Sequence, residues 1–138
     1  FNSLDYSFTV GGENGADTVN RAPGGGSPAL RRQLKVLSEF LHEFDLAKLQ
    51  PDPLLVGRSP GVVVRSLSHS GRAHAIYLEG RGPTTLSLHL AKGRWSADWI
   101  SVTDGSVLKR ESVASNGRVV ELASPDFLDG IAVRLFRI

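Results

Sequence analysis

The sequence contains no cysteine and no methionine among its 138 residues. Without cysteine, a disulfide framework and thiolate metal sites are both excluded. No apolar run reaches the length of about 18 residues that a membrane-spanning helix needs, so we predict no membrane partner. An excess of charge of one sign is also missing, because 16 Lys and Arg oppose 14 Asp and Glu and leave a net charge of +2.

The arginines are spread along the chain, for example at Arg31, Arg58, Arg81, Arg110 and Arg137. Proteins that bind nucleic acid gather their cations in a block or along one face. We therefore predict no nucleic-acid partner. The chain begins at Phe1 rather than at methionine, and we expect it to be a piece of a larger protein.

Residues 1–50 predict a connector rather than a domain. Alternating apolar residues at 1–10 favour a strand, and the glycine-rich stretch 11–26 favours a long loop. Ser27 and Pro28 suit the start of a helix, as N-cap and first helical residue. We predict a helix at residues 28–44, with an apolar stripe made by Leu30, Leu34, Leu37, Leu41 and Phe44. The stripe is expected to pack on the sandwich predicted below or on a neighbouring domain, and a partner-binding helix is the alternative.

Residues 51–138 predict a mainly β fold, an antiparallel β-sandwich of about seven strands. Short β-rich runs occur at 62–67, 73–78, 84–90, 95–102, 107–113, 119–122 and 131–136. Asp104-Gly105 and Asn116-Gly117 are strong hairpin signals, because type I′ turns need positive φ at both central residues. Leu86, Leu88 and Leu90 alternate with polar residues, as in a sheet with one solvated face.

Motifs for catalysis are largely missing. The four histidines (His42, His69, His74 and His89) lack the spacing of a helical zinc site, so no metal or other cofactor is predicted. A two-histidine site from His74 and His89 on paired strands is a minor alternative to surface histidines. No nucleophile elbow occurs. The Gly24–Ser27 stretch (GGGS) lacks the lysine of a P-loop, so it is interpreted as a flexible loop rather than an anion site.

Two tryptophans four residues apart are a candidate ligand site. On one strand, Trp95 and Trp99 share a face and could stack on sugar rings. The alternative, which we favour, is that both fill the core between the sheets. Arg94 and Asp98 then lie on the opposite face and are expected to be solvated.

Acidic residues near the N-terminus are the second candidate. Asp5 and Asp17, with Glu13 between them, accompany Tyr6 beside the long loop. Paired carboxylates are what glycoside hydrolysis requires, although polar loop residues are the simpler interpretation.

Several segments resemble the C-terminal region of bacterial glycoside hydrolases in which a (β/α)₈ barrel precedes a small sandwich labelled the collagen-binding domain of a collagenase. These segments are residues 2–11 (NSLDYSFTVG), 24–34 (GGGSPALRRQL), 73–78 (AHAIYL), 86–88 (LSL), 95–99 (WSADW) and 131–135 (IAVRL). The strand after Asp104-Gly105 is more polar than the family pattern.

The resemblance implies that residues 1–27 are the last barrel strand and its loop, and that the helix is the final barrel helix. Asp5 and Tyr6 would then lie near a sugar site of the parent, because active sites of such barrels sit on the loops after the strands. The other barrel strands are absent, so the general acid and the nucleophile are not in this chain.

Together these observations predict a non-catalytic accessory domain whose partner is the catalytic barrel of the same, secreted or periplasmic, protein. The alternative is a module that binds a polysaccharide or a matrix protein on its own. An independent enzyme is disfavoured, since the sequence shows no complete catalytic site. The candidate ligand-binding residues are Asp5, Tyr6, Trp95 and Trp99.

Overall fold

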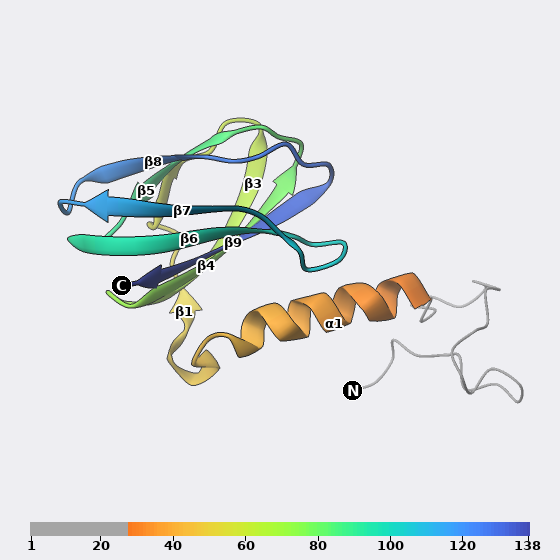
Figure 1. The fold of residues 1–138 in the computed structure, drawn as a ribbon. Helices are drawn as coiled ribbons and strands as arrows, with labels where there is room; N and C mark the ends of the chain where they lie inside the picture. Colours follow the sequence, from red (N-terminus) through yellow and green to blue (C-terminus); the bar gives the residue numbers. More distant parts are fainter. Residues whose placement is uncertain (1–27) are drawn as a thin grey trace, which may run out of the picture.

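The fold is mainly β, with one helix laid on the outside of two antiparallel sheets (Figure 1). The computed structural model describes residues 28–138. In this range helix α1 (Pro28–His42) and the 3-10 helix η1 (Leu46–Lys48) precede the strands β1 to β9. The predicted β-sandwich is confirmed. The strand predicted at 1–10 and the loop at 11–26 lie outside the described residues.

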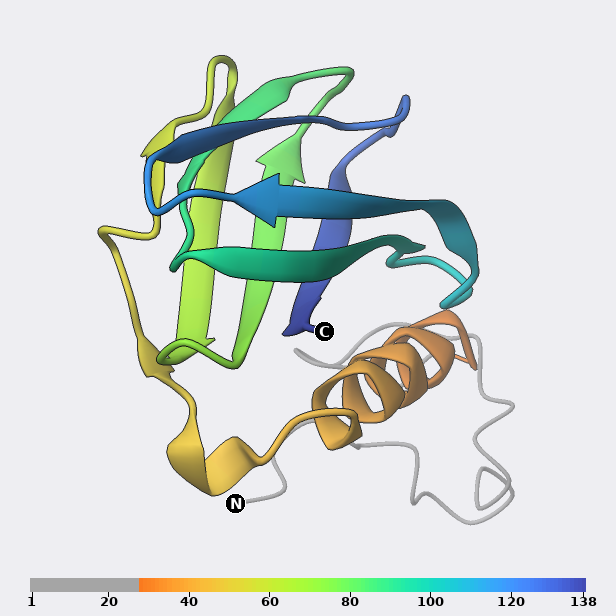
Figure 2. The same cartoon turned by 60° about the vertical axis from the view of Figure 1, so that its left-hand side comes forward.

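The strands form a large and a small sheet, with the orders β1-β3-β4-β9-β6-β7 and β2-β5-β8. The large sheet contains β1 (Gln50–Pro51), β3 (Val62–His69), β4 (Ala73–Gly80), β9 (Gly130–Arg137), β6 (Gly93–Ser101) and β7 (Val107–Ser115). The small sheet contains β2 (Val56–Arg58), β5 (Thr85–His89) and β8 (Val119–Ala123). The large sheet is strongly twisted, so that β6 and β7 run across the direction of β3 and β4 in Figure 2.

All seven predicted strand runs are present with shifted ends, and two short strands were missed. β1 and β2 span two and three residues, which is too short for a period of two to be visible. The two strongest turn signals behave differently. Asp104-Gly105 joins β6 to its ladder neighbour β7, whereas Asn116-Gly117 carries the chain from β7 in the large sheet to β8 in the small one. Gly105 and Gly117 have φ of 77° and 87°, which glycine adopts without strain.

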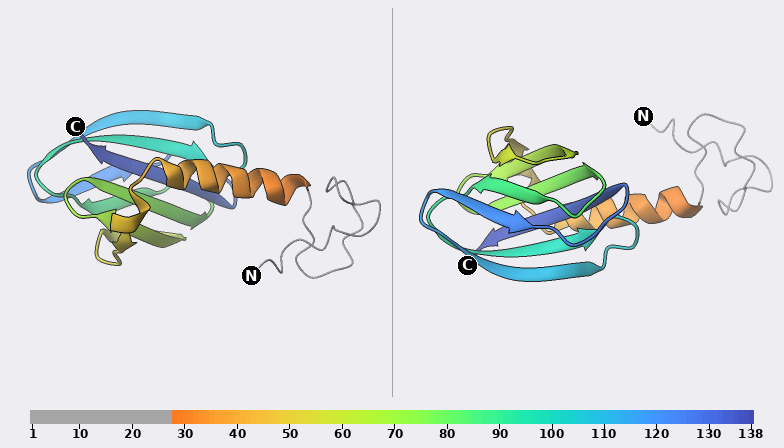
Figure 3. Two further views of the ribbon diagram at one scale, coloured as in Figure 1. Left: turned by 90° about the horizontal axis from the view of Figure 1, so that it is seen from below. Right: turned by 90° about the horizontal axis from the view of Figure 1, so that it is seen from above.

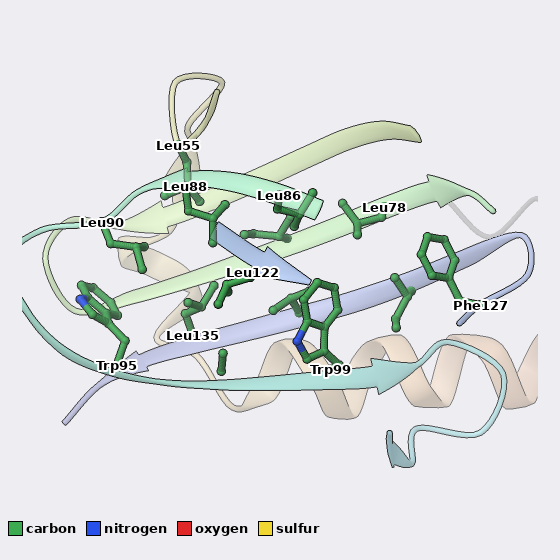
Figure 4. Packing of buried hydrophobic residues seen from close by; sticks show 14 residues of the cluster. Leu55, Leu78, Leu86, Leu88, Leu90, Trp95, Trp99, Leu122, Phe127 and Leu135 are labelled. Atoms are coloured by element: carbon green, nitrogen blue, oxygen red, sulfur yellow. The ribbon is translucent and has the colours of Figure 1, made fainter. Parts of the chain in front are cut away.

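The core lies between the two sheets (Figure 4), and the alternation predicted for residues 86–90 is confirmed. β5 contributes Leu86 and Leu88, which are fully buried, while Thr85 and His89 on the other parity are exposed. The large sheet contributes fully buried side chains from its central strands, among them Trp95, Ala97, Trp99, Ile131, Val133 and Leu135.

Helix α1 lies on the outer face of the large sheet (Figure 3). At its C-terminal end Phe44 packs with Ala73 and Ala75 in a second apolar cluster. The ring of Phe44 stacks on Phe136 of β9 with a centroid distance of 5.0 Å, and Phe40 approaches it at 5.4 Å. Aromatic pairs at such distances add to the stabilisation that burial provides. This end of the helix is therefore fixed to the sandwich.

The helix buries a different strip from the one predicted. It ends at His42 rather than at residue 44, and Val36 is buried at 9% exposure. In contrast, Leu34 and Leu37 of the predicted stripe are 44% and 51% exposed. The apolar face is wider than the line of leucines, and the sheet covers only the flank that contains Val36 and Phe40. In this part of the helix the leucine stripe does not pack on the sandwich, and its packing on a neighbouring domain or a partner stays a prediction.

Candidate functional site

Both candidate tryptophans belong to the core. Trp95 and Trp99 have 0% exposure, and their rings lie between the sheets (Figure 4). Each indole N–H is satisfied internally: Trp95 Nε1 donates to Ala91 O at 3.0 Å and Trp99 Nε1 to Glu111 Oε1 at 2.8 Å. A sugar-stacking platform needs exposed ring faces, so these two residues do not form one. The interpretation as core residues is confirmed.

The other two candidate ligand residues, Asp5 and Tyr6, lie outside the described residues, as do Glu13, Asp17 and the stretch 24–27. Their proposed place near a sugar site stays a prediction. Within residues 28–138 no group of three His, Asp or Glu side chains could hold a metal ion. No helix in the same range has the length and apolar character needed to cross a bilayer.

The expectation that Asp98 is solvated is wrong, because its exposure is 6%. The ladder register places Asp98 opposite Arg110 on β7 and Arg134 on β9. Arg110 donates through Nε at 2.7 Å and Nη2 at 3.0 Å, and Arg134 Nη2 donates to Oδ2 at 2.9 Å. These bonds, first of all those from Arg110, hold the pKa of Asp98 below its usual range. The carboxylate thus links three strands on the outer face, and Arg94 is exposed as predicted.

The two-histidine site is not formed. His89 lies on the exposed side of β5 in the small sheet, whereas His74 lies on β4 in the large sheet with 5% exposure. The ring of His74 packs against Trp95 with a centroid distance of 4.9 Å. His74 is therefore neither a metal ligand with His89 nor a surface histidine.

His74 belongs to a short hydrogen-bonded chain with Ser68 and Asp52. Ser68 Oγ is 2.7 Å from Asp52 Oδ2 and 2.7 Å from His74 Nδ1. An ionised carboxylate only accepts, so the Ser68 hydroxyl donates to Asp52 and Nδ1–H of His74 donates to Ser68. The bare Nε2 is buried without a partner, and burial lowers the pKa of His74 to about 4. With serine between the other two groups, the order is not that of a catalytic triad.

The most distinctive surface feature is the exposed part of the apolar face of α1. Leu34, Leu37 and Leu41 lie about a third of a turn around the helix axis from Val36 and Phe40, given 100° per residue. We call these three leucines the leucine strip. Leu41 is half-buried, and Leu34 and Leu37 are about half exposed. Exposed leucines in a contiguous strip are typical of surfaces that pack against another protein segment.

A cleft of about 460 Å³ separates the leucine strip from the sheet. Its walls are mainly apolar: Val36, Leu37, Phe40, Tyr77, Ile100, Val102 and Ala132 line it, together with Gln33 and Ser101. Small-molecule sites combine such walls with several convergent polar groups. Here the polar side chains are few, so the cleft suits an apolar protein segment better than a sugar.

Sequence reasoning missed this surface because its residues come from distant segments. Tyr77 on β4, Ile100 on β6 and Ala132 on β9 meet through the strand order β4-β9-β6. Each was recognised as a strand residue, but none carried a signal for the outer face. The one available signal was the width of the apolar face of α1, since Val36 and Phe40 extend it beyond the leucines.

Comparisons with known proteins give a likeness in fold. No protein-family model matches the sequence, and no curated protein matches it either. The chain is similar in structure to a glycoside hydrolase family 5 protein from Bacteroides vulgatus, with a TM-score of 0.61 and 15% identity. It is also similar to a protein described as a glycoside hydrolase, with a TM-score of 0.58 and 13% identity.

The structural match covers only a minor part of the length of each of these two proteins. The matches cover 79% and 85% of this chain but 24% and 26% of the two glycoside hydrolases. At such identities the likeness shows a shared fold. The sandwich and its helix therefore correspond to about a quarter of the length of each neighbour.

Proposed function

We propose that this chain is a non-catalytic accessory domain of a larger glycoside hydrolase, and that it packs against the catalytic (β/α)₈ barrel and stabilises it. The observation that carries the proposal is the leucine strip. One flank of α1 is buried on the sheet, while Leu34 and Leu37 on the other flank remain about half exposed. A helix that is apolar over such a wide face is normally covered on both flanks.

The fold neighbours support the choice of partner. Both are glycoside hydrolases, and about three quarters of each lies outside the matched region. A barrel joined to the N-terminal end of α1 would be tethered beside the leucine strip, which favours docking even through a modest contact. Secretion or a periplasmic location belongs to the same proposal, since it rests on the resemblance to secreted enzymes.

The runner-up function is a module that binds a polysaccharide or collagen on its own through Trp95 and Trp99. Both side chains are buried at 0% exposure. Among residues 28–138, Tyr77 is the one aromatic residue with a substantially exposed side chain, at 36%. A single ring offers no paired stacking surface. These features favour the accessory role.

The test compares the full-length enzyme with a form that lacks residues 28–138 and with the double variant Leu34→Glu, Leu37→Glu. We expect both changes to lower the thermal stability of the catalytic domain. The double variant should lower the free energy of unfolding of the catalytic domain by at least about 3 kcal/mol if both leucines are buried at the interface. Unfolding followed by calorimetry and by loss of hydrolysis provides the measurement.

The matched control is Leu46→Glu, Leu54→Glu, which changes two exposed leucines (48% and 80%) away from the strip. It should leave the catalytic domain unaffected. A catalytic domain that is equally stable without residues 28–138 would contradict the proposed function. Saturable binding of the isolated chain to collagen, lost in a folded tryptophan variant, would favour the runner-up.

A further inference from the structure

Cations that are far apart in the sequence meet at one end of the sandwich. Four turn and strand-end segments form this end: 69–73, 91–95, 115–119 and 136–138. They contain five exposed basic side chains, and we call this set the basic end: Arg72, Lys92, Arg94, Arg118 and Arg137. No Asp or Glu occurs in the four segments. The opposite end carries Glu79, Asp104, Asp126 and Asp129.

The strand ladder fixes the order of these cations. Arg72 precedes β4 and accepts a backbone hydrogen bond from Arg137 of β9 at 2.9 Å. Arg94 on β6 lies next along the sheet, since its carbonyl accepts from Ile138 N at 3.0 Å. Neighbouring strands are about 4.8 Å apart. The basic end therefore contains a row of three arginines, Arg72, Arg137 and Arg94, whose backbones are neighbours in the sheet.

Arg137 holds two turns of this row in place. Its Nη1 donates to Gly71 O at 3.3 Å and its Nη2 to Lys92 O at 2.8 Å. The guanidinium lies over Gly93, where an added Cβ would come within 2.9 Å of Nε. Arginine carries five donors, so two bonds leave further N–H groups for a ligand. The cation at the centre of the row is thus fixed before a ligand arrives.

The row borders a hollow of about 370 Å³ that Gly71, Arg72 and Arg137 line. Within residues 28–138, none of the five cations forms an ion pair with a carboxylate. Glu43 and Asp45 line a second hollow together with Arg72. They pair instead with Arg134 at 3.5 Å and with Lys48 at 2.6 Å. The positive field of the basic end is therefore not neutralised by its neighbours.

We propose that the basic end binds an acidic polysaccharide, a polymer whose sugar units carry carboxylate groups, with one carboxylate seated in the hollow between Arg72 and Arg137. A guanidinium pairs with a carboxylate through two parallel N–H···O bonds, which a row of arginines can repeat along a charged polymer. This site goes beyond the accessory role, because the basic end and the exposed leucines Leu34 and Leu37 lie at opposite ends of the large sheet.

A polysaccharide fits this end better than a nucleic acid. Single-stranded nucleic acids are held by aromatic rings on which bases stack, between cations that follow the backbone. The aromatic residues of the four segments are Trp95, Phe136 and the half-buried His69. Trp95 is fully buried, and Phe136 is stacked on Phe44. The basic end therefore offers charge and hydrogen bonds but no stacking surface in the described residues.

Affinity electrophoresis of the 138-residue chain in gels that contain polygalacturonate, dextran or neither tests the proposal. We expect retardation by polygalacturonate alone, weakening as salt is raised from 50 to about 300 mM because screening shortens the reach of surface charges. The double variant Arg72→Gln, Arg94→Gln should weaken binding about 25-fold, at about fivefold for each exposed charge pair. Arg137→Lys keeps the charge but removes the paired N–H donors of the guanidinium. It should weaken binding by less than the double variant does.

The matched control is Arg58→Gln, Arg81→Gln, which removes two exposed charges outside the basic end and should bind as the unaltered chain does. Circular dichroism establishes that each variant is folded. Equal losses in the two double variants would mean that net charge alone is responsible and would overturn the site. Equal retardation by dextran, or tighter binding of a single-stranded oligonucleotide than of polygalacturonate, would also overturn it. None of these results bears on the docking of the leucine strip.

Discussion

The two faces of the large sheet differ in how far this chain completes them. The inner face is closed by the small sheet, and Trp95, Trp99 and Val133 have 0% exposure there. The outer face is covered by α1 only in part. It combines the buried carboxylate of Asp98, which pairs with Arg110 and Arg134, with an open apolar cleft of about 460 Å³ beside Leu37. The difference teaches that this chain closes its own core, whereas its outer face keeps an apolar surface, which the proposed docking would cover.

The largest expected effect is on the inner face. Trp99→Ala removes a fully buried indole together with its N–H donor to Glu111 Oε1, which keeps Lys109 Nζ at 2.9 Å. We expect a loss of about 3–5 kcal/mol in the free energy of unfolding. Urea denaturation followed by circular dichroism measures it. A variant as stable as the wild type would contradict the assignment of Trp99 to the core.

The second effect concerns His74, which is buried on the inner face beside Trp95. Burial lowers the pKa of His74 from the usual 6.5 to about 4 in the folded state. Between these values the unfolded chain binds a proton that the folded chain does not, so stability falls as pH drops from 6.5 to 4. The total loss is about 3 kcal/mol, after which the contribution of His74 is constant.

Urea denaturation between pH 7.5 and pH 4 measures this loss, with His74→Phe as the variant. Phenylalanine keeps a ring against Trp95 but does not titrate, and Ser68 retains its bond to Asp52. We therefore expect a shallower pH dependence in the variant, while His89→Phe on the exposed side of β5 should keep the wild-type dependence. Identical curves for His74→Phe and the wild type would refute this role for His74.

A pair of isoleucines compares the two faces directly. Ile131 points into the core with 0% exposure, while Ile100 lines the cleft on the outer face with 4% exposure. Ile131→Ala should lower the free energy of unfolding by about 3–4 kcal/mol. Ile100→Ala should lower it by about 1–2 kcal/mol, because the cleft already leaves open space beside Ile100. Equal losses in the isolated chain would break the comparison. In the full-length enzyme the cost of Ile100→Ala should rise, since the proposed docking covers the cleft.

The smallest expected effect sharpens the comparison. In the isolated chain, Leu34→Glu, Leu37→Glu should change the free energy of unfolding by no more than about 0.5 kcal/mol, as for other surface substitutions. A substantial loss would show that the leucine strip is already covered by the chain itself.

Most of the sandwich could be predicted from the sequence, because alternation and turn chemistry are local. Leu86, Leu88 and Leu90 set the inner face of β5, and Asp104-Gly105 set the β6–β7 hairpin. The two short strands β1 and β2 carried no such pattern.

The outer face of the large sheet and the basic end could not be predicted, because strand pairing brings their residues together from distant parts of the sequence. Asp98 is buried since two arginines face it from neighbouring strands, at sequence separations of 12 and 36. The cations of the basic end looked scattered for the same reason. In α1, a line of leucines suggested one buried stripe, but only the position of the sheet decides which flank is covered.

The most direct test of the central claim is hydrogen exchange of the backbone amides of α1, measured in the proposed parent glycoside hydrolase and in the isolated chain. Amide protection reports the free energy of local opening. We predict that the amides around Leu34 and Leu37 exchange at least about tenfold more slowly in the full-length enzyme, because docking adds about 1.4 kcal/mol or more to the cost of opening this turn. Equal exchange rates in both forms would contradict the claim that the catalytic domain covers the leucine strip.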